Sequence, residues 1–250
     1  MNKASKLICE FVGTFALCYI GGAGVISAKA AGASDGMTLL IAALAHGLIL
    51  FVAVAATINV SGAYFNPAVT ITMWFNKRID GSGAIGFLIV QFAASLAAGG
   101  LLAIMAMYGG SSDAWTEAAR NAALGNPTFD TANLALPAVI GSEMVLTFLL
   151  VFVIWGAAID PRNGRHSGAL AIGLVVAANV LAAGSITGTS MNPARSFGPG
   201  FITSLMPGDY LPHFWTMQVA YFIGPILGAL AAGIIYEKFI LPPGEGRSPV

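Results

Sequence analysis

Two short stretches of this chain carry matching residues at the same spacing. The first is Ser-Gly-Ala-Tyr-Phe-Asn-Pro-Ala-Val-Thr at 61–70, and the second is Thr-Gly-Thr-Ser-Met-Asn-Pro-Ala-Arg-Ser at 187–196, an offset of 126 residues. An asparagine amide provides N–H donors, and Arg195 adds a fixed positive charge. Such groups bind by hydrogen bonds and by charge rather than make or break covalent bonds.

Each stretch predicts a loop that turns into a helix. Asn66 and Asn192 are good N-caps, and Pro67 and Pro193 fit the first helical position, where a missing N–H costs nothing. Each lies inside a long apolar segment, where irregular backbone is tolerated only when it is buried in protein or lines a cavity. Two half-helices, at about 67–76 and 193–204, in equivalent places of an internal repeat indicate a pore or binding site near the membrane midplane.

The composition indicates a polytopic membrane protein. Hydrophobic residues make up 57% of the chain and charged residues 9%, against about 25% charged residues in soluble domains. A net charge of zero argues against a nucleic-acid partner. Cys9 and Cys18 lie nine residues apart in one apolar segment and do not form a disulfide framework. Because no nucleophile–base pair, metal cluster or phosphate loop is present, we expect no enzyme activity, cofactor or metal.

Six segments have the roughly 20 apolar residues that a membrane span needs. They are about 6–28, 37–60, 82–108, 137–159, 167–184 and 212–238. The repeat extends into them, because Glu10 matches Glu143 and Gln91 matches Gln218. Three spans in each half is an odd number, so the second half should enter the membrane upside down.

The expected fold is therefore an all-α membrane protein of six transmembrane helices and two re-entrant half-helices, arranged as an inverted 3+3 repeat. We expect one channel domain over 1–250. It comprises repeat 1 at about 5–108, an outer loop at 109–136, repeat 2 at about 137–238 and a disordered tail at 239–250.

The basic residues predict the orientation. Eight lie on one side of this arrangement and two, Lys29 and Arg120, on the other. Cytoplasmic loops carry the excess of Lys and Arg, so we expect both termini in the cytoplasm. The eight are Lys3, Lys6, Lys77, Arg78, Arg162, Arg165, Lys238 and Arg247.

These motifs resemble those of the aquaporin (major intrinsic protein) family, and the resemblance covers nearly the whole chain. It rests on two Asn-Pro-Ala triplets, Asn66-Pro67-Ala68 and Asn192-Pro193-Ala194. The resemblance implies that both asparagine amides face the lumen, where a passing water molecule accepts hydrogen bonds from them. Taken alone, each asparagine could equally be a simple N-cap.

The resemblance also implies an outer selectivity filter formed by His46, Val180, Thr189 and Arg195. This set departs from the narrow water-specific pattern and is similar to that of plant vacuolar aquaporins. A lone histidine on an apolar helix is more often a satisfied core residue, which is the alternative for His46. Ser196 after the arginine, and the aromatic pair that begins at Tyr221, favour the water-channel branch over glycerol facilitators.

Glu10, Glu143 and Arg195 are the charged residues expected within the membrane, where such groups are expensive and functional by default. By resemblance the two acids lie behind the pore and accept hydrogen bonds from the re-entrant loops. A proton relay is the alternative for them.

The function expected from these residues is a passive channel for water and for ammonia or other small neutral solutes, excluding protons and ions. A glycerol or urea facilitator, a coupled secondary transporter and a structural junction protein with residual permeability are the alternatives. We expect a multi-pass protein of the plasma membrane, with the vacuolar membrane as the alternative. The resemblance implies a homotetramer in the bilayer.

Overall fold

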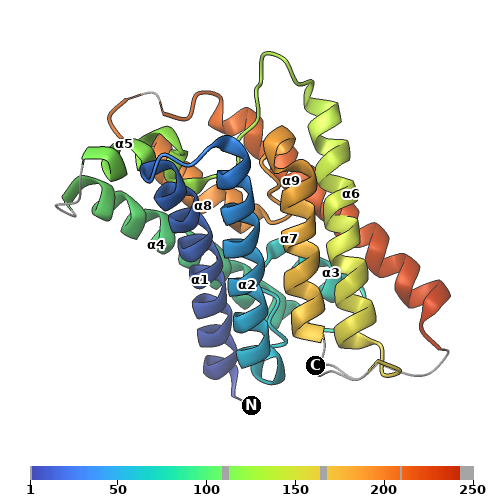
Figure 1. Ribbon diagram of the computed structural model, residues 1–250. Helices are drawn as coiled ribbons and strands as arrows, with labels where there is room; N and C mark the ends of the chain where they lie inside the picture. The colour runs from blue at the N-terminus through green and yellow to red at the C-terminus, as the bar shows by residue number, and fades with distance from the viewer. Residues whose placement is uncertain (1, 109–112, 164–167, 209, 243–250) are drawn as a thin grey trace.

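The computed structural model describes residues 2–108, 113–163, 168–208 and 210–242, and the described residues contain helices but no strands. Six helices are long and apolar enough to span a membrane, which confirms the predicted fold (Figure 1). Two of the six end in a π-helical turn, η2 after α6 and η4 after α9. The spans are α1 (Lys3–Ala30), α2 (Asp35–Ser61), α4 (Gly81–Tyr108), α6 (Leu136–Ile154) with η2 (Trp155–Ile159), α7 (Gly168–Thr187), and α9 (Phe214–Ile235) with η4 (Tyr236–Ile240).

Two short helices complete the membrane part. They are α3 (Pro67–Phe75) and α8 (Pro193–Ser204), and each begins at the proline of a triplet, as predicted. In Figure 1 both lie among the spanning helices. Helix α3 packs on α4 and α9, whereas α8 packs on α4, α9 and α1.

The two halves meet where α2 crosses α7, at repeat-equivalent glycines. A Cβ on Gly47 would lie 2.7 Å from the Gly173 carbonyl oxygen, and a Cβ on Gly173 would lie 2.5 Å from the Gly47 carbonyl oxygen. The backbones therefore touch, which is how small residues let membrane helices approach closely. Because each glycine contacts the other in the same way, a two-fold relation between the halves passes through this crossing.

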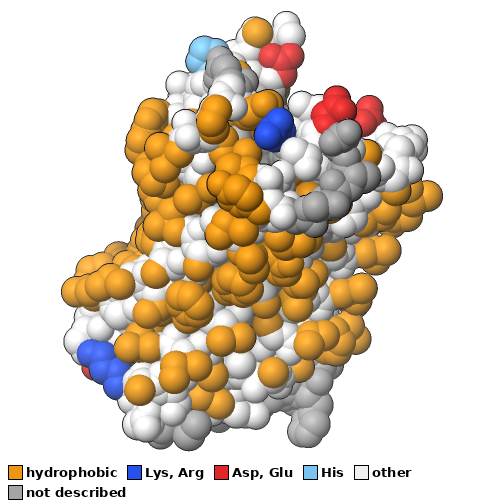
Figure 2. Space-filling model, turned by 90° about the vertical axis from the view of Figure 1, so that its left-hand side faces the viewer, with side chains coloured by type: hydrophobic (Ala, Val, Ile, Leu, Met, Phe, Trp, Pro, Cys, Tyr) orange, Lys and Arg blue, Asp and Glu red, His pale blue; other side chains and the backbone are white. Residues whose placement is uncertain are grey.

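The outer surface of the bundle is apolar. Figure 2 shows hydrophobic side chains over a broad band, with charged side chains gathered toward the two ends. Large side chains such as Leu48, Ile89 and Val145 are exposed on this band. The chain is thus an integral multi-pass membrane protein, whose spans face lipid on one side and the protein core on the other.

The segment expected as an outer loop at 109–136 contains helical structure that the sequence analysis missed. Helix α5 (Asp113–Asn121) and a 3-10 turn (Ala123–Gly125) lie within it. Helix α5 is polar on one face and apolar on the other, so a search for long apolar segments does not detect it.

The carboxyl-terminal helix is longer than expected, because η4 continues to Ile240. Residues 239 and 240, which were expected in a disordered tail, are therefore helical, and residues 243–250 of that expected tail lie outside the described residues. Two of the basic residues used for orientation, Arg165 and Arg247, also lie outside them.

Candidate pore and selectivity filter

The two triplet asparagines cap their helices in the same way. Asn66 Oδ1 accepts from the backbone N–H of Ala68 at 2.9 Å, and Asn192 Oδ1 accepts from that of Ala194 at 3.0 Å. Both caps have extended backbone, with φ of −152° and −154°. The oxygen of each amide is thereby oriented toward its helix, and its NH2 group points away from that helix.

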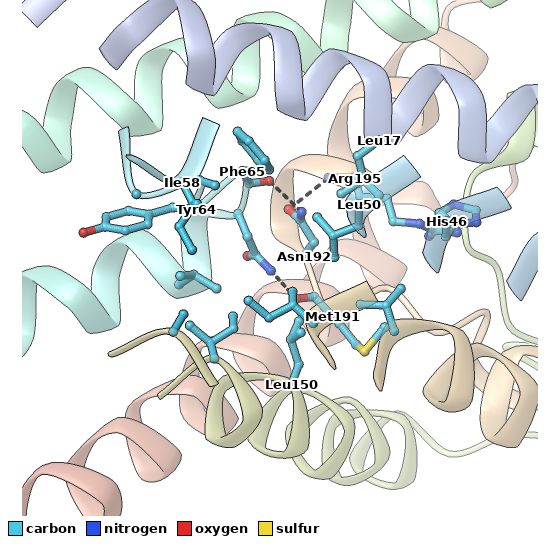
Figure 3. Close-up of a pocket in the computed structure, with 18 of the residues that line it drawn as sticks. Leu17, His46, Leu50, Ile58, Tyr64, Phe65, Leu150, Met191, Asn192 and Arg195 are labelled. Atoms are coloured by element: carbon cyan, nitrogen blue, oxygen red, sulfur yellow. Dashed lines mark hydrogen bonds between the residues drawn. The ribbon is translucent and has the colours of Figure 1, made fainter. Parts of the chain in front are cut away.

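Each NH2 group reaches the opposite loop. Asn66 Nδ2 donates to the carbonyl of Met191 at 2.8 Å, and Asn192 Nδ2 donates to the carbonyl of Phe65 at 2.9 Å (Figure 3). Because an amide NH2 carries two N–H donors, one donor of each asparagine is used in this exchange and one is left for a solute. The expectation that the amides simply face the lumen is therefore modified: they also tie the two half-helices together.

The loops before the half-helices share an unusual backbone. Ala63 and Phe65 have φ of 55° and 50°, and their repeat equivalents Thr189 and Met191 have φ of 46° and 52°. Residues other than glycine adopt this left-handed region rarely and at a cost. This backbone turns the loop carbonyls of Phe65 and Met191 toward the asparagines of the opposite half.

Glu10 holds the first loop in place. Its carboxylate accepts from Ser61 Oγ at 2.7 Å, from the backbone N–H groups of Tyr64 and Phe65 at 2.9 and 2.8 Å, and from Gln91 Nε2 at 2.9 Å. The side chain is fully buried. A carboxylate can be buried when hydrogen bonds occupy its lone pairs.

Glu143 holds the second loop in the same way. It accepts from Thr187 Oγ1 at 2.9 Å and from the backbone N–H groups of Ser190 and Met191 at 3.0 and 2.8 Å. Each donor stands 126 residues after its counterpart in the first loop, as the repeat predicts. The contacts are those expected of a structural support for the re-entrant loops.

A cavity with a volume of about 60 Å³ runs past both asparagines. At roughly 10–15 Å³ for each water molecule, this volume holds a few waters. Its walls are largely apolar, with side chains such as Leu50, Leu150 and Val176. The structure brings all six predicted pore-facing side chains to this one cavity: Asn66, Asn192, His46, Val180, Thr189 and Arg195.

His46 and Arg195 lie near one another and form a polar part of the cavity wall (Figure 3). His46 Nδ1 lies 2.8 Å from the carbonyl oxygen of Ala42. Because a carbonyl oxygen only accepts, Nδ1 carries the proton, and in the neutral ring Nε2 is then an acceptor. Arg195 Nη1 is buried and has no hydrogen-bond partner among the described residues. This part of the cavity wall thus carries an imidazole nitrogen that can accept and a guanidinium that can donate.

Three polar or close-packed contacts at this site were not predicted. Asn179 Nδ2 donates to the carbonyl of Leu146 at 2.9 Å and lies 3.1 Å from the sulfur of Met191. In the first half, the ring of Phe65 occupies the space beside Gly13, where a Cβ would lie 2.1 Å from the ring. The repeat offset of 126 residues pairs Phe65 with Met191. Nothing in the motif, however, indicates which residues pack behind these two side chains.

Ala158 and Ile159 of η2 also line the cavity. Asp160 follows directly and accepts from Arg162 Nε at 2.9 Å and from the hydroxyl of Tyr236 at 3.0 Å. The hydrogen bonds from Arg162 hold the pKa of Asp160 well below its usual value.

Among the described residues, no three His, Cys, Asp or Glu side chains form a group that could bind a metal.

Comparison with known proteins agrees with this geometry. The family model described as "Major intrinsic protein" matches residues 1–236. The chain is 38% identical over 244 residues to Aquaporin TIP4-1 of Zea mays, covering 94% of this chain and 85% of the relative. It is 36% identical over 245 residues to Aquaporin TIP2-1 of Arabidopsis thaliana, covering 95% and 88%.

Among solved structures, the fold is similar to that of the aquaglyceroporin from Plasmodium falciparum. The TM-score is 0.78 at 21% identity, covering 96% of this chain and 97% of that one. This likeness supports the fold alone. The names of these relatives give no support to the expected location in the plasma membrane.

Membership of the family follows from the extent of these matches. The family model covers nearly the whole chain, and the relatives exceed 30% identity over most of their own length. The chain therefore belongs to the major intrinsic protein (aquaporin) family, whose members are channels and not enzymes.

Proposed function

We propose that the chain is a passive water channel that also passes ammonia and excludes protons and ions. The observation that carries the proposal is that both triplet asparagines and the four expected filter residues line the same cavity. Its apolar walls give a passing molecule few hydrogen bonds, so the few polar groups determine what can cross. The names of the relatives, plant aquaporins, support water as the main solute.

Exclusion of ions is proposed to depend on Arg195. Among the described residues that line the cavity, it is the one with a permanently charged side chain, and it is 8% exposed. Because Arg195 lines the cavity, its guanidinium can donate a hydrogen bond to a neutral solute, while its charge repels a cation. The positive ends of α3 and α8 meet at the centre of the cavity and oppose protons there.

Passage of ammonia is proposed to depend on His46 and Val180. Ammonia can donate an N–H to His46 Nε2 and accept from Arg195, which matches the acceptor and donor of the filter. Val180 leaves its side of the filter apolar and lined by a short side chain. A bulkier polar residue at this position would narrow the lumen and bind water more tightly.

The test is the ratio of ammonia to water permeability in proteoliposomes, measured by stopped flow at equal protein density. The double variant His46→Phe with Val180→His should narrow the filter and lower this ratio. Leu48→Phe is the matched control, because Leu48 lies two residues from His46 and faces lipid, with 55% of its surface exposed. An unchanged ratio in the double variant would refute the ammonia proposal.

The same vesicles separate the alternatives. A coupled transporter would respond to an imposed ion gradient, whereas a passive channel would not. A glycerol or urea facilitator would pass those solutes at rates that exceed lipid leakage several-fold. A junction protein would show little permeability of any kind.

We propose that both termini face the cytoplasm. The Arg78 guanidinium pairs with Glu237 at 2.7 Å, and Arg162 donates to the Ile240 carbonyl at 3.0 Å, so the basic loops and the end of η4 lie together. Lys29 lies at the far end of α1. A reporter fused to the carboxyl terminus should therefore be found in the cytoplasm. An extracellular signal would contradict the proposed topology.

The homotetramer is proposed from the family alone, and cross-linking in native membranes tests it.

A further inference from the structure

Helix α1 has no side chain at the point where it faces the filter histidine. A Cβ built on Gly21 would lie 2.3 Å from His46 Nε2, 2.4 Å from Cδ2 and 2.7 Å from Cε1. Real Cβ atoms essentially never approach another heavy atom within 3.0 Å. The imidazole therefore occupies space that any residue other than glycine would fill.

The imidazole has little freedom to yield. It is 2% exposed, and Nδ1 is bonded to the carbonyl of Ala42 one turn earlier in α2. His46 lines the cavity whereas Gly21 does not, so the ring stands between Gly21 and the lumen. A methyl group on Gly21 would displace the ring toward the lumen, or rotate it and break the bond to Ala42.

We propose that Gly21 is a positioning residue that determines solute selectivity. By having no side chain it lets the His46 ring withdraw against α1, which sets the width of the filter and the direction of Nε2. The proposal rests on the function proposed above, because it explains how α1 leaves room for His46 to act as a filter residue.

Helix packing alone does not account for this glycine. The three nearest atoms to a Cβ at Gly21 all belong to the His46 ring. One turn further along α1, a Cβ on Gly24 would instead lie 2.7 Å from the Cβ of Ala45, so Gly24 serves the contact between α1 and α2. The two glycines lie on the same helix and at the same interface, and only one of them bears on the filter.

The experiment is a double-mutant cycle between Gly21→Ala and His46→Ala, with Gly24→Ala as the control. The readouts are water, ammonia and urea permeability per reconstituted channel, and the thermal stability of the detergent-solubilised protein. Loss of one net hydrogen bond of about 1 kcal/mol corresponds to about fivefold, so Gly21→Ala should lower the ratio of ammonia to water permeability by about fivefold. In the His46→Ala background the same change should have no further effect, because the ring it displaces is gone.

The melting temperature gives a second test of the proposal, which remains valid even if Gly21→Ala folds poorly. The clash predicts that Gly21→Ala lowers the melting temperature and that adding His46→Ala restores part of it. Gly24→Ala should show no such recovery, because its clash is with Ala45. Recovery that is equal for both glycines would overturn the proposal.

The outcomes for Gly21 and for the proposed function are distinguishable. If His46→Ala changes the permeability ratios and Gly21→Ala does not, the filter role of His46 stands and the role of Gly21 is refuted. If neither variant changes any permeability ratio, the filter role of His46 in the proposed function is refuted. If Gly21→Ala changes the ratio equally with and without His46, it acts through general packing and the inference is overturned.

Discussion

Replacing the Glu10 carboxylate with an amide tests how far the first re-entrant loop depends on it. Oxygen Oε1 accepts from Ser61 Oγ and Tyr64 N, and Oε2 accepts from Phe65 N and Gln91 Nε2. In Glu10→Gln one oxygen becomes an NH2 group, which cannot accept. The least costly placement puts this group at the Oε1 position, because the Ser61 hydroxyl can rotate to accept from it. Only the N–H of Tyr64 is then left without a partner.

The expected cost follows from counting unpaired donors. One buried backbone N–H without a partner costs about 1–3 kcal/mol, so Glu10→Gln should lose about that much stability. Glu10→Ala leaves the N–H groups of both Tyr64 and Phe65 unpaired and should lose about 2–6 kcal/mol. At roughly 2–4 °C for each kcal/mol in a chain of this size, the amide variant should melt about 2–12 °C lower. Thermal unfolding in detergent, followed by water flux per folded channel, measures both effects.

Glu117→Gln is the control, because Glu117 is exposed on α5 and its loss should change stability by less than about 0.5 kcal/mol. A structural role for Glu10 predicts that the amide variant loses stability and excludes protons as the wild type does. If Glu10→Gln instead has the melting temperature of the wild type and changes a proton current, the carboxylate relays protons and its structural role is refuted.

Three further outcomes are expected. Arg195→Val should keep water flux and admit protons or cations in voltage-clamp and pH-dye assays; a folded, water-conducting variant that leaks no ions would contradict the charge-exclusion role. Thr189 lines the cavity and neither free cysteine does, so water flux should resist mercurials and Thr189→Cys should become sensitive; strong inhibition of both proteins would contradict this. The lowered pKa of Asp160 means that its contribution to stability is present above its unfolded value of about 3.9 and is lost only as pH falls below it. The difference in melting temperature between wild type and Asp160→Asn should therefore persist from pH 7.5 to 4.5, and a difference that vanishes near pH 6 would contradict the assignment.

The parts of this structure that the sequence predicts are those that a local rule determines. The half-helices begin at Pro67 and Pro193, because an asparagine cap followed by proline leaves few other arrangements. The six spans follow from apolar length, and their inversion follows from the odd number in each half. The pairing of Glu10 and Glu143 with equivalent loop donors follows from the repeat offset.

The remaining features depend on contacts between segments far apart in the chain. The exchange of hydrogen bonds between each asparagine and the opposite loop requires two strained turns to face one another, and no spacing within either motif specifies this. Helix α5 depends on its packing against α1 and α4. The space at Gly21 becomes informative only once His46 is known to lie against it.

The inverted repeat also carries a difference in polarity between equivalent positions of the two halves. At the 126-residue offset, the counterparts of His46, Thr189 and Arg195 are Ile172, Ala63 and Val69, which are all apolar and all line the same cavity. The two loops have similar backbone conformations, and the equivalent residues Ala63 and Thr189 both have positive φ. One scaffold therefore carries two equivalent sets of positions, one with polar side chains and one with apolar side chains.

This division has a physical consequence for transport. A second charged or hydrogen-bonding ring would hold the solute again and slow its release, since conduction requires binding that is weak enough to leave. In the proposed channel, a molecule that has passed Arg195 and the two asparagines meets Ile172 and Val69, an apolar wall with few groups that retain it. We therefore expect recognition to be concentrated where His46 and Arg195 lie, so that a change of side chain there, or of the glycine behind His46, alters which solutes cross.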